Sequence, residues 1–261
     1  TMTTTEKTST DGMAARVERG ERKMAANGKE SRMKPTASKL IRWAGLAAMG
    51  AGIIFAVIQP IHPPDVLSSV TTAQWAIIQS LKTAMCILGL LGMAGLYARQ
   101  VKEAGWLGLA GYLLFSLFYA LTLPFVFAQA FILPLLATTA PAFVESWLGI
   151  FNGHPGEMNL GALPALYTLT SVGYVLGGLL FGIATLRAGI LPRWAAGLLA
   201  VGAVAPFVLA VLPHPLDRTF AVPMGLALAW LGYALWSERR EQALEPVPGT
   251  GSPQLRQTGA E

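Results

Sequence analysis

Residues 78–99, IQSLKTAMCILGLLGMAGLYAR, set the pattern that decides the fold. Between Lys82 and Arg99 there are 16 consecutive uncharged residues, and apolar side chains would cover every side of a helix formed by them. A helix that is apolar all round must be buried in protein or lie in a bilayer. About 20 such residues cross the hydrocarbon core of a membrane. The stretch therefore predicts a transmembrane helix.

The same pattern recurs through most of the chain. Of the 261 residues, 53% are hydrophobic and 13% are charged, whereas a soluble domain has about 25% charged residues. Only 11 charged side chains lie between Trp43 and Trp236. We predict an all-α polytopic transmembrane bundle, because the strands of a β-barrel would alternate polar and apolar residues. The six expected spans cover approximately residues 41–59, 78–98, 105–133, 161–186, 194–212 and 219–236.

The charges outside the spans predict the domains and the orientation. We expect a disordered basic tail over 1–39, a six-helix domain over 40–240 and a flexible tail over 241–261. With both termini in the cytoplasm, 17 of the 19 Lys and Arg residues lie on the cytoplasmic side, as the positive-inside rule requires. The predicted location is the cell (inner) membrane.

The expected partners follow from the same charges. The basic N-terminal tail favours the bilayer and its anionic lipids, and we expect no nucleic acid to bind. Homo-oligomers and hetero-oligomers both remain open.

A short internal similarity divides the spans into three helical hairpins. The segment RWAGL at 42–46 recurs as RWAAGL at 193–198, and WLGL at 106–109 is similar to both. The predicted repeats cover residues 40–100, 104–188 and 190–240. Parallel repeats of this kind occur in membrane transporters.

Two further segments carry a family resemblance. RAGILPRW at 187–194, together with GYALW at 232–236, resembles a broad group of uncharacterised bacterial multi-pass (six-helix) integral membrane proteins. The resemblance covers about two spans and implies the architecture only.

The three histidines of the chain share one local pattern, His-Pro-x-acid. Each falls in the expected outer loop of one hairpin, so the three copies are predicted at one face of the membrane. Imidazoles and carboxylates are ordinary ligands of zinc, manganese, iron and copper, and two histidines can hold haem. The candidate metal or ligand residues are His62, Asp65, His154, Glu157, His214 and Asp217. The candidate cofactor is a divalent transition metal or haem.

Two other interpretations of this motif stay open. Pro in the first turn and an acid near the N-terminus both favour the start of a helix, with His as an unusual cap. Histidines also titrate near neutral pH, which would suit a proton-responsive cluster.

Other polar residues within or near the spans are candidates too. Lys82 is expected near the outer edge of its span, where it either reaches the interface or serves a function, and Gln79 fits the same interfacial turn. The run YTLTSVGY at 167–174 is polar for a span and predicts either helix contacts or a substrate path. The loop at 134–160 predicts a short amphipathic helix, with Phe143, Trp147 and Phe151 on its apolar side.

These features favour a binding function over an enzymatic one. The sequence has no Walker loop, dinucleotide glycine box, His-Glu-x-x-His pair or Gly-x-Ser-x-Gly elbow. We expect a non-enzymatic membrane protein that binds or passes a small ligand or cation at the outer-face His and acid cluster. The alternatives are a structural or assembly subunit of a membrane complex, and a membrane-embedded metalloenzyme.

Overall fold

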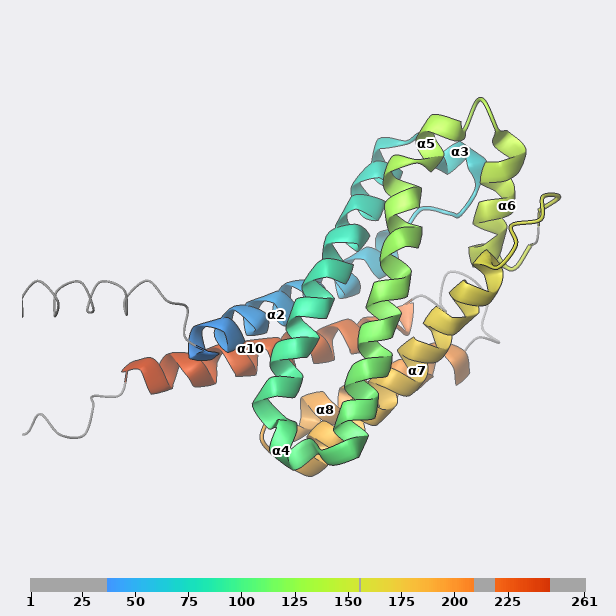
Figure 1. Ribbon diagram of the computed structural model, residues 1–261. Helices are drawn as coiled ribbons and strands as arrows, with labels where there is room; N and C mark the ends of the chain where they lie inside the picture. Colours follow the sequence, from blue (N-terminus) through green and yellow to red (C-terminus); the bar gives the residue numbers. More distant parts are fainter. Residues whose placement is uncertain (1–36, 155, 209–218, 245–261) are drawn as a thin grey trace, which may run out of the picture. The chain divides into compact units, whose positions relative to one another are not determined.

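The described part of the chain is built from helices. The computed structural model describes residues 37–154, 156–208 and 219–244, and no strand occurs in these ranges (Figure 1). By its internal contacts the chain divides into Thr1–Leu40 and Ile41–Glu261, and the packing below belongs to the second unit. The all-α prediction is confirmed for the described residues. His214 and Asp217, and nearly all of the two predicted tails, lie outside them.

Several of the helices are long and apolar. In chain order they are α2 (Ala37–Ile61), α3 (Leu67–Val70), α4 (Ala73–Phe131), α5 (Leu133–Leu136), α6 (Pro141–Asn152), α7 (Leu163–Ala188), α8 (Arg193–Val208) and α10 (Val222–Leu244). Three of them, α2, α4 and α7, contain stretches that are long and apolar enough to cross a membrane. Helices α8 and α10 contain shorter apolar segments. The lengths and composition of these helices indicate a membrane protein.

Helix α4 consists of two helices joined by a sharp turn. At 1.5 Å per residue its 59 residues would extend about 90 Å, roughly three times the ~30 Å hydrocarbon core. The backbone leaves helical geometry at Gln100 and at Gly105, where φ is 57° and ψ is −158°. Only glycine adopts such a conformation readily. The first arm (73–99) therefore turns back into the second arm (106–131), as Figure 1 shows.

Glycines let the helices of the bundle approach closely. A Cβ atom added to Gly173 of α7 would lie 2.9 Å from Leu114 O of α4, and one added to Gly177 would meet the backbone of Phe115. On the side toward α8, a Cβ on Gly182 would lie 2.7 Å from Ala200 N. These small residues therefore allow α7 to pack closely against both α4 and α8.

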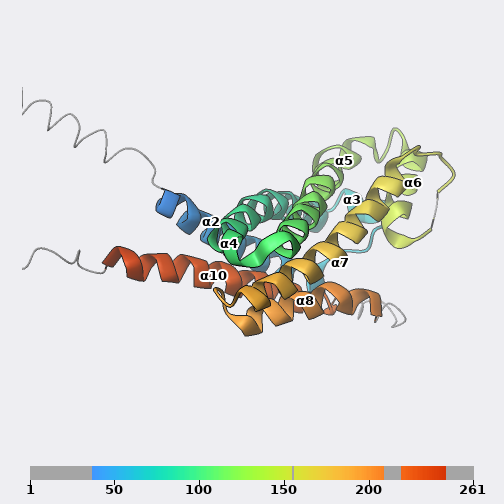
Figure 2. The same cartoon turned by 60° about the horizontal axis from the view of Figure 1, so that its bottom comes forward.

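The α2–α10 glycine seam joins the first and last of the described helices. Gly45 and Gly52 of α2 face Gly232 and Gly225 of α10, and each pair of glycines is seven residues apart in the sequence. A Cβ on Gly45 would lie 2.9 Å from Gly232 O, and one on Gly225 would lie 2.7 Å from Gly52 O. Both views show α2 and α10 side by side (Figures 1 and 2).

The short helices form a second apolar cluster beside one end of α4. Here α6 buries Val144, Trp147 and Leu148 and exposes Glu145. The buried face packs with Trp75 and Phe125 from the two arms of α4. The predicted amphipathic helix in the 134–160 segment is therefore confirmed, and its apolar side covers the end of the bundle.

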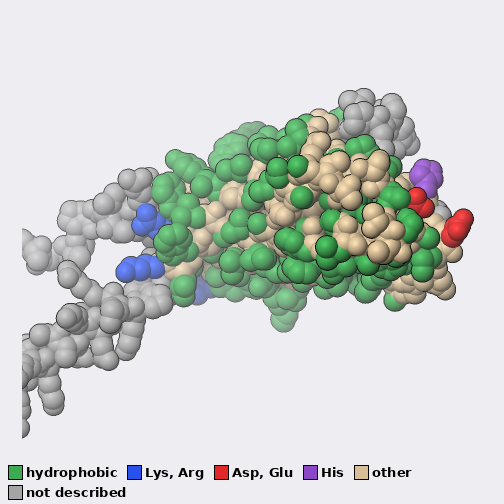
Figure 3. All heavy atoms as spheres, turned by 90° about the horizontal axis from the view of Figure 1, so that it is seen from above, with side chains coloured by type: hydrophobic (Ala, Val, Ile, Leu, Met, Phe, Trp, Pro, Cys, Tyr) green, Lys and Arg blue, Asp and Glu red, His purple; other side chains and the backbone are tan. Residues whose placement is uncertain are grey.

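Large apolar side chains also cover the outside of the described helices. Examples are Ile87 in α4, Val172 in α7 and Val201 in α8, which are 49%, 42% and 66% exposed. On the face drawn in Figure 3, hydrophobic side chains occupy the middle, Lys and Arg lie toward one end, and Asp, Glu and His lie toward the other. Such a surface suits lipid in the middle and water at the ends.

Candidate functional site

A lysine and a histidine meet where the loop after α2 contacts the first arm of α4. Lys82 Nζ donates to His62 Nε2 at 3.2 Å, and both side chains are partly buried. The two residues are 20 positions apart in the sequence. A charged side chain within an apolar helix commonly marks a functional site. Both residues were candidates from the sequence, but a contact between them was not predicted.

The other ring nitrogen of His62 defines the direction of this hydrogen bond. His62 Nδ1 lies 2.7 Å from Pro63 O, and a carbonyl oxygen can only accept, so Nδ1 carries the proton. In the neutral ring Nε2 is then an acceptor for the Lys82 ammonium. The imidazole therefore orients the lysine side chain toward the loop after α2.

The start of α4 holds the loop that carries His62 in position. Thr72 caps the helix, because its Oγ1 accepts from Trp75 N at 3.2 Å. The buried Trp75 ring packs edge-on against His62, with ring centroids 6.4 Å apart. Its Nε1 donates to Gln129 O in the second arm of α4 at 2.8 Å. Both arms of α4 thus fix the place of His62.

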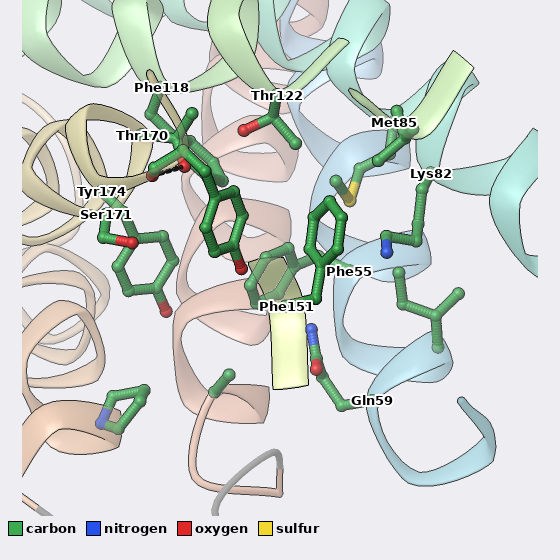
Figure 4. Close-up of a pocket in the computed structure, with 15 residues that line it drawn as sticks. Phe55, Gln59, Lys82, Met85, Phe118, Thr122, Phe151, Thr170, Ser171 and Tyr174 are labelled. Atoms are coloured by element: carbon green, nitrogen blue, oxygen red, sulfur yellow. Dashed lines mark hydrogen bonds between the residues drawn. The ribbon is translucent and has the colours of Figure 1, made fainter. Parts of the chain in front are cut away.

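Lys82 lies on the wall of a cavity within the bundle, which we call the bundle cavity. Its volume is about 350 Å³, and its walls come from α2, both arms of α4, α6, α7, α8 and Ala221 just before α10. Most of the wall is apolar, including Phe55, Met85, Phe118 and Phe151. Figure 4 shows Lys82 and Gln59 on one side of this space and Tyr174 and Ser171 on the other.

Hydroxyl groups form the polar part of the opposite wall. They belong to Thr122 on α4 and to Tyr167, Thr170, Ser171 and Tyr174 on α7. Thr170 Oγ1 donates to Tyr167 O within its own helix at 2.7 Å. Thr122 Oγ1 is buried and forms no hydrogen bond with the described residues. The polar run at 167–174 thus bonds its own helix through Thr170 and also lines a cavity, and its role as a substrate path stays a prediction.

A second cavity, the loop pocket, lies next to the bundle cavity and shares Gln59 with it. Its volume is about 530 Å³, and His62, Asp65, Asn152 and His154 are among the residues that line it. Asn152 Nδ2 donates to Asp65 O at 3.1 Å, and Asn152 Oδ1 accepts from His154 N at 2.9 Å. The first bond ties the end of α6 to the loop after α2, and the second holds the backbone just after α6.

The loop pocket gathers part of the predicted His and acid cluster. His62, Asp65 and His154 line it, whereas Glu157 is exposed and is not among its described lining residues. Thr219, which directly follows the segment that contains the third motif, lines it as well. Among the residues that the structure describes, no group of three or more His, Cys, Asp or Glu side chains could hold a metal ion.

The helix-cap interpretation of the motif is wrong for its first two copies. After the motif at His62, α3 begins at Leu67 without a side-chain cap, and α4 is capped by Thr72. After the motif at His154, α7 begins at Leu163, and its N-cap residue Ala162 has no side chain that could accept a hydrogen bond. The histidines lie five or more residues before the helices that they were expected to start.

The two polar residues predicted at the membrane edge both turn inward. Lys82 faces the bundle cavity and reaches His62, so its ammonium does not extend toward lipid. Gln79, one turn earlier, is fully buried, and neither of its amide atoms bonds with the described residues. The interfacial position expected for the Gln79 amide is therefore not observed.

Several residues of the bundle cavity carried no signal that sequence reasoning could use. Phe55, Phe118 and Thr122 are ordinary residues for a membrane helix, and only the packing brings them to one space. Lys82 was the available signal, because a charge inside a span is rare.

Comparisons with known protein families, with curated proteins and with solved structures find no match for this chain.

Proposed function

We propose that this chain is a six-span protein of the cell (inner) membrane with both termini in the cytoplasm. The spans would be α2, the two arms of α4, α7, α8 and α10. The turn between the arms of α4 supports this orientation, because it carries the exposed Lys102 and lies near Arg99. In this orientation the loop pocket faces the outside. The three hairpin repeats and the resemblance to bacterial six-helix proteins remain predictions from sequence.

The function that the geometry supports best is the binding or passage of a small ligand through the bundle cavity. The observation that carries this proposal is Lys82, a charged residue on the wall of a largely apolar cavity. Small-molecule sites typically have volumes of about 300–1,000 Å³ and a few polar groups within apolar walls. The bundle cavity, at about 350 Å³, meets both criteria.

The loop pocket is then the entrance from the outer face. It shares Gln59 with the bundle cavity, and the hydrogen bond between Lys82 and His62 connects the two. The proposed binding site therefore lies in the interior of the bundle and not at the outer-face His and acid cluster that the sequence predicted. His62, Asp65 and His154 would be passed by the ligand on its way in.

The metalloenzyme alternative finds no support in the described part of the chain, where the His and acid residues form no group of three. The structural or assembly alternative predicts that the cavity has no ligand at all. An experiment that fills the cavity therefore distinguishes this alternative from the proposed ligand binding.

Filling the cavity should abolish ligand binding while a matched change on the lipid face should not. Ser171 lines the cavity, and its neighbour Val172 is 42% exposed on the outside of the same helix. We expect Ser171→Phe to lose small molecules that copurify with the protein, measured by mass spectrometry of organic extracts. The Val172→Phe protein should retain them. Identical extracts from both variants and the unmodified protein would contradict the proposal.

A further inference from the structure

We propose that the bundle cavity binds a flat, uncharged ring with an oxygen atom at each end, the chemistry of a quinone head group, and that Gln59 and Ser171 donate hydrogen bonds to the two oxygens. The inference rests on the proposed function, because it names the ligand class of the same cavity. Three features of the wall lead to it: the polar groups that are accessible, their positions, and the aromatic rings around a space of limited size.

Most of the polar groups on the wall already have a partner or cannot be reached. The Lys82 ammonium and the hydroxyls of Thr170 and Tyr174 each donate to another atom of the protein. Thr122 Oγ1 is fully buried, so a molecule in the cavity does not touch it. The recognition of a ligand must therefore be sought in other groups of the wall.

Gln59 and Ser171 differ from these groups. Both side chains line the cavity and are half-buried. Neither forms a hydrogen bond with the described residues, and neither carries one of the fully buried polar atoms. Their polar atoms are therefore accessible and have hydrogen-bonding capacity to spare. The carboxamide of Gln59 has two N–H donors, and the hydroxyl of Ser171 has one O–H donor.

The two accessible groups lie on opposite sides of the space and on different helices. Gln59 belongs to the last turn of α2, and Ser171 to the first half of α7. Figure 4 shows Gln59 on one side of the cavity and Ser171, beside Tyr174, on the other. A rigid molecule accepts a hydrogen bond from both only if it has acceptor atoms at opposite ends. Two carbonyl oxygens across a ring meet this condition.

The chemistry of these two groups favours a ligand without a charge. Both side chains are neutral, and the described residues that line the cavity include no Asp or Glu. A charge that enters a largely apolar space loses its hydration and needs a counter-charge or several hydrogen bonds in return. A neutral ring with two carbonyl oxygens needs only the hydrogen bonds that Gln59 and Ser171 can donate.

The size of the cavity and its aromatic rings fit the body of such a molecule. At the ~30 Å³ that a water molecule occupies in the liquid, 350 Å³ corresponds to about a dozen non-hydrogen atoms, the size of a methylated benzoquinone. The rings of Phe55, Phe118, Phe151 and Tyr174 come to the wall from α2, α4, α6 and α7. Aromatic side chains pack with their faces and edges against another flat ring.

The test compares three probes that share a benzene ring with four methyl groups. Duroquinone carries two carbonyl oxygens, durene carries no oxygen, and tetramethylbenzoate is an anion. Equilibrium binding of the radiolabelled probes to the full chain in lipid nanodiscs is measured, and binding to empty nanodiscs is subtracted. We expect duroquinone to bind at least about tenfold more tightly than tetramethylbenzoate.

Two variants remove the donors without adding volume. We expect Gln59→Leu and Ser171→Ala each to weaken the binding of duroquinone by about three- to tenfold, the usual effect of one hydrogen bond, and to change that of durene by less than about twofold. Thr168→Val is the control, because it removes a hydroxyl from an exposed residue of the same helix that is not among those lining the cavity. This control should leave the affinity for duroquinone unchanged.

Infrared spectroscopy reports on the same two hydrogen bonds. A hydrogen bond lowers the stretching frequency of a carbonyl group, so bound duroquinone should absorb at lower frequency than duroquinone in empty nanodiscs. In each single variant, one of the two carbonyl groups should return toward the free frequency. A general loosening of the fold would not release one carbonyl group and leave the other bound.

The outcomes separate this inference from the proposed function. Tetramethylbenzoate that binds as tightly as duroquinone would overturn the uncharged class. Duroquinone and durene that lose affinity equally in Gln59→Leu and Ser171→Ala, or unshifted carbonyl bands, would overturn the two hydrogen bonds. Failure of duroquinone to bind to the unmodified protein would overturn the quinone assignment, and the extracts of Ser171→Phe would still decide whether the cavity holds another ligand.

Discussion

Thr72 holds the beginning of α4 with two hydrogen bonds from one hydroxyl. Its Oγ1 accepts from Trp75 N at 3.2 Å and donates to Ser69 O at 2.7 Å. The first bond satisfies a helix N–H that has no partner within the helix, and the second joins α4 to the short helix before it. Because Trp75 packs on His62, this cap also supports the loop that reaches Lys82.

Removing this hydroxyl should destabilise the protein by about 0.5–2 kcal/mol, the range measured for caps of this type. The change is Thr72→Ala, and the measurement is the free energy of unfolding in detergent. Thr71→Ala is the control, because Thr71 is exposed and lies one residue before the cap. It should change the stability by less than about 0.5 kcal/mol. Equal effects of the two changes would contradict the capping role.

The residue scale also shows why the His-Pro-x-acid motif was open to more than one interpretation. Proline and an acid do favour a helix start, but Thr72 is a better cap than His62 and lies directly before α4. Nine residues lie between the two, and the chain uses them for a loop and for α3. The contact between His62 and Lys82 depends on the path of this loop, which residue types alone do not define. The position of Lys82 in an apolar helix was predictable, and its partner was not.

At the scale of the helices, the α2–α10 glycine seam brings the first and the last of the described helices into close contact. Helix pairs in lipid gain little from the hydrophobic effect, so they depend on close packing and on small residues at the contact. At Gly52 an added Cβ would meet the backbone of Ala229 and of Gly225, which belong to one turn of α10. Backbone atoms cannot move aside as a side chain can.

We therefore expect Gly52→Ala to destabilise the protein by about 1–3 kcal/mol, the usual cost of overpacking. Gly50→Ala in the same helix is the matched control, because the nearest atom to its Cβ would be Leu88 Cδ1 at 3.4 Å. That contact is an ordinary one, and alanine favours the helix by up to about 1 kcal/mol over glycine. Thermal unfolding of both variants in the same detergent measures the difference. A Gly52→Ala protein as stable as Gly50→Ala would show that α2 and α10 are not packed this closely.

The positions of the helices could be predicted well from the sequence. Which helices pack against one another could be predicted only in part. The uncharged stretch before Arg99 and the charges at 102–103 predicted where the first arm of α4 ends. The four-residue spacing of Gly173 and Gly177 favours a close helix contact, and the structure places both glycines against α4. The seven-residue spacing of Gly45 and Gly52 is equally visible in the sequence. That it matches Gly225 and Gly232, about 180 residues later, follows only from the tertiary packing.

At the scale of the whole molecule, the proposed orientation can be tested with single cysteines. The native Cys86 is fully buried, so it should react little with a polar thiol reagent. We expect Glu145→Cys, on the exposed side of α6, to react in intact cells with a reagent that does not cross the membrane. Lys102→Cys, in the turn of α4, should react only after the cells are opened. Labelling is followed by the mass of the modified protein, and the reverse pattern would overturn the orientation and the outer position of the loop pocket.

The glycine seam has a consequence for the way this protein is made. The ribosome makes α2 long before α10, yet each needs the other to cover a row of exposed backbone. Helix α2 must therefore remain incompletely packed in the membrane until α10 has been made. A chain that stops before residue 222 would keep every residue of the bundle cavity but leave Gly45 and Gly52 facing lipid. Membrane quality control, which removes helices that lack their partners, would then act on shortened chains that still contain the described residues of the proposed ligand site.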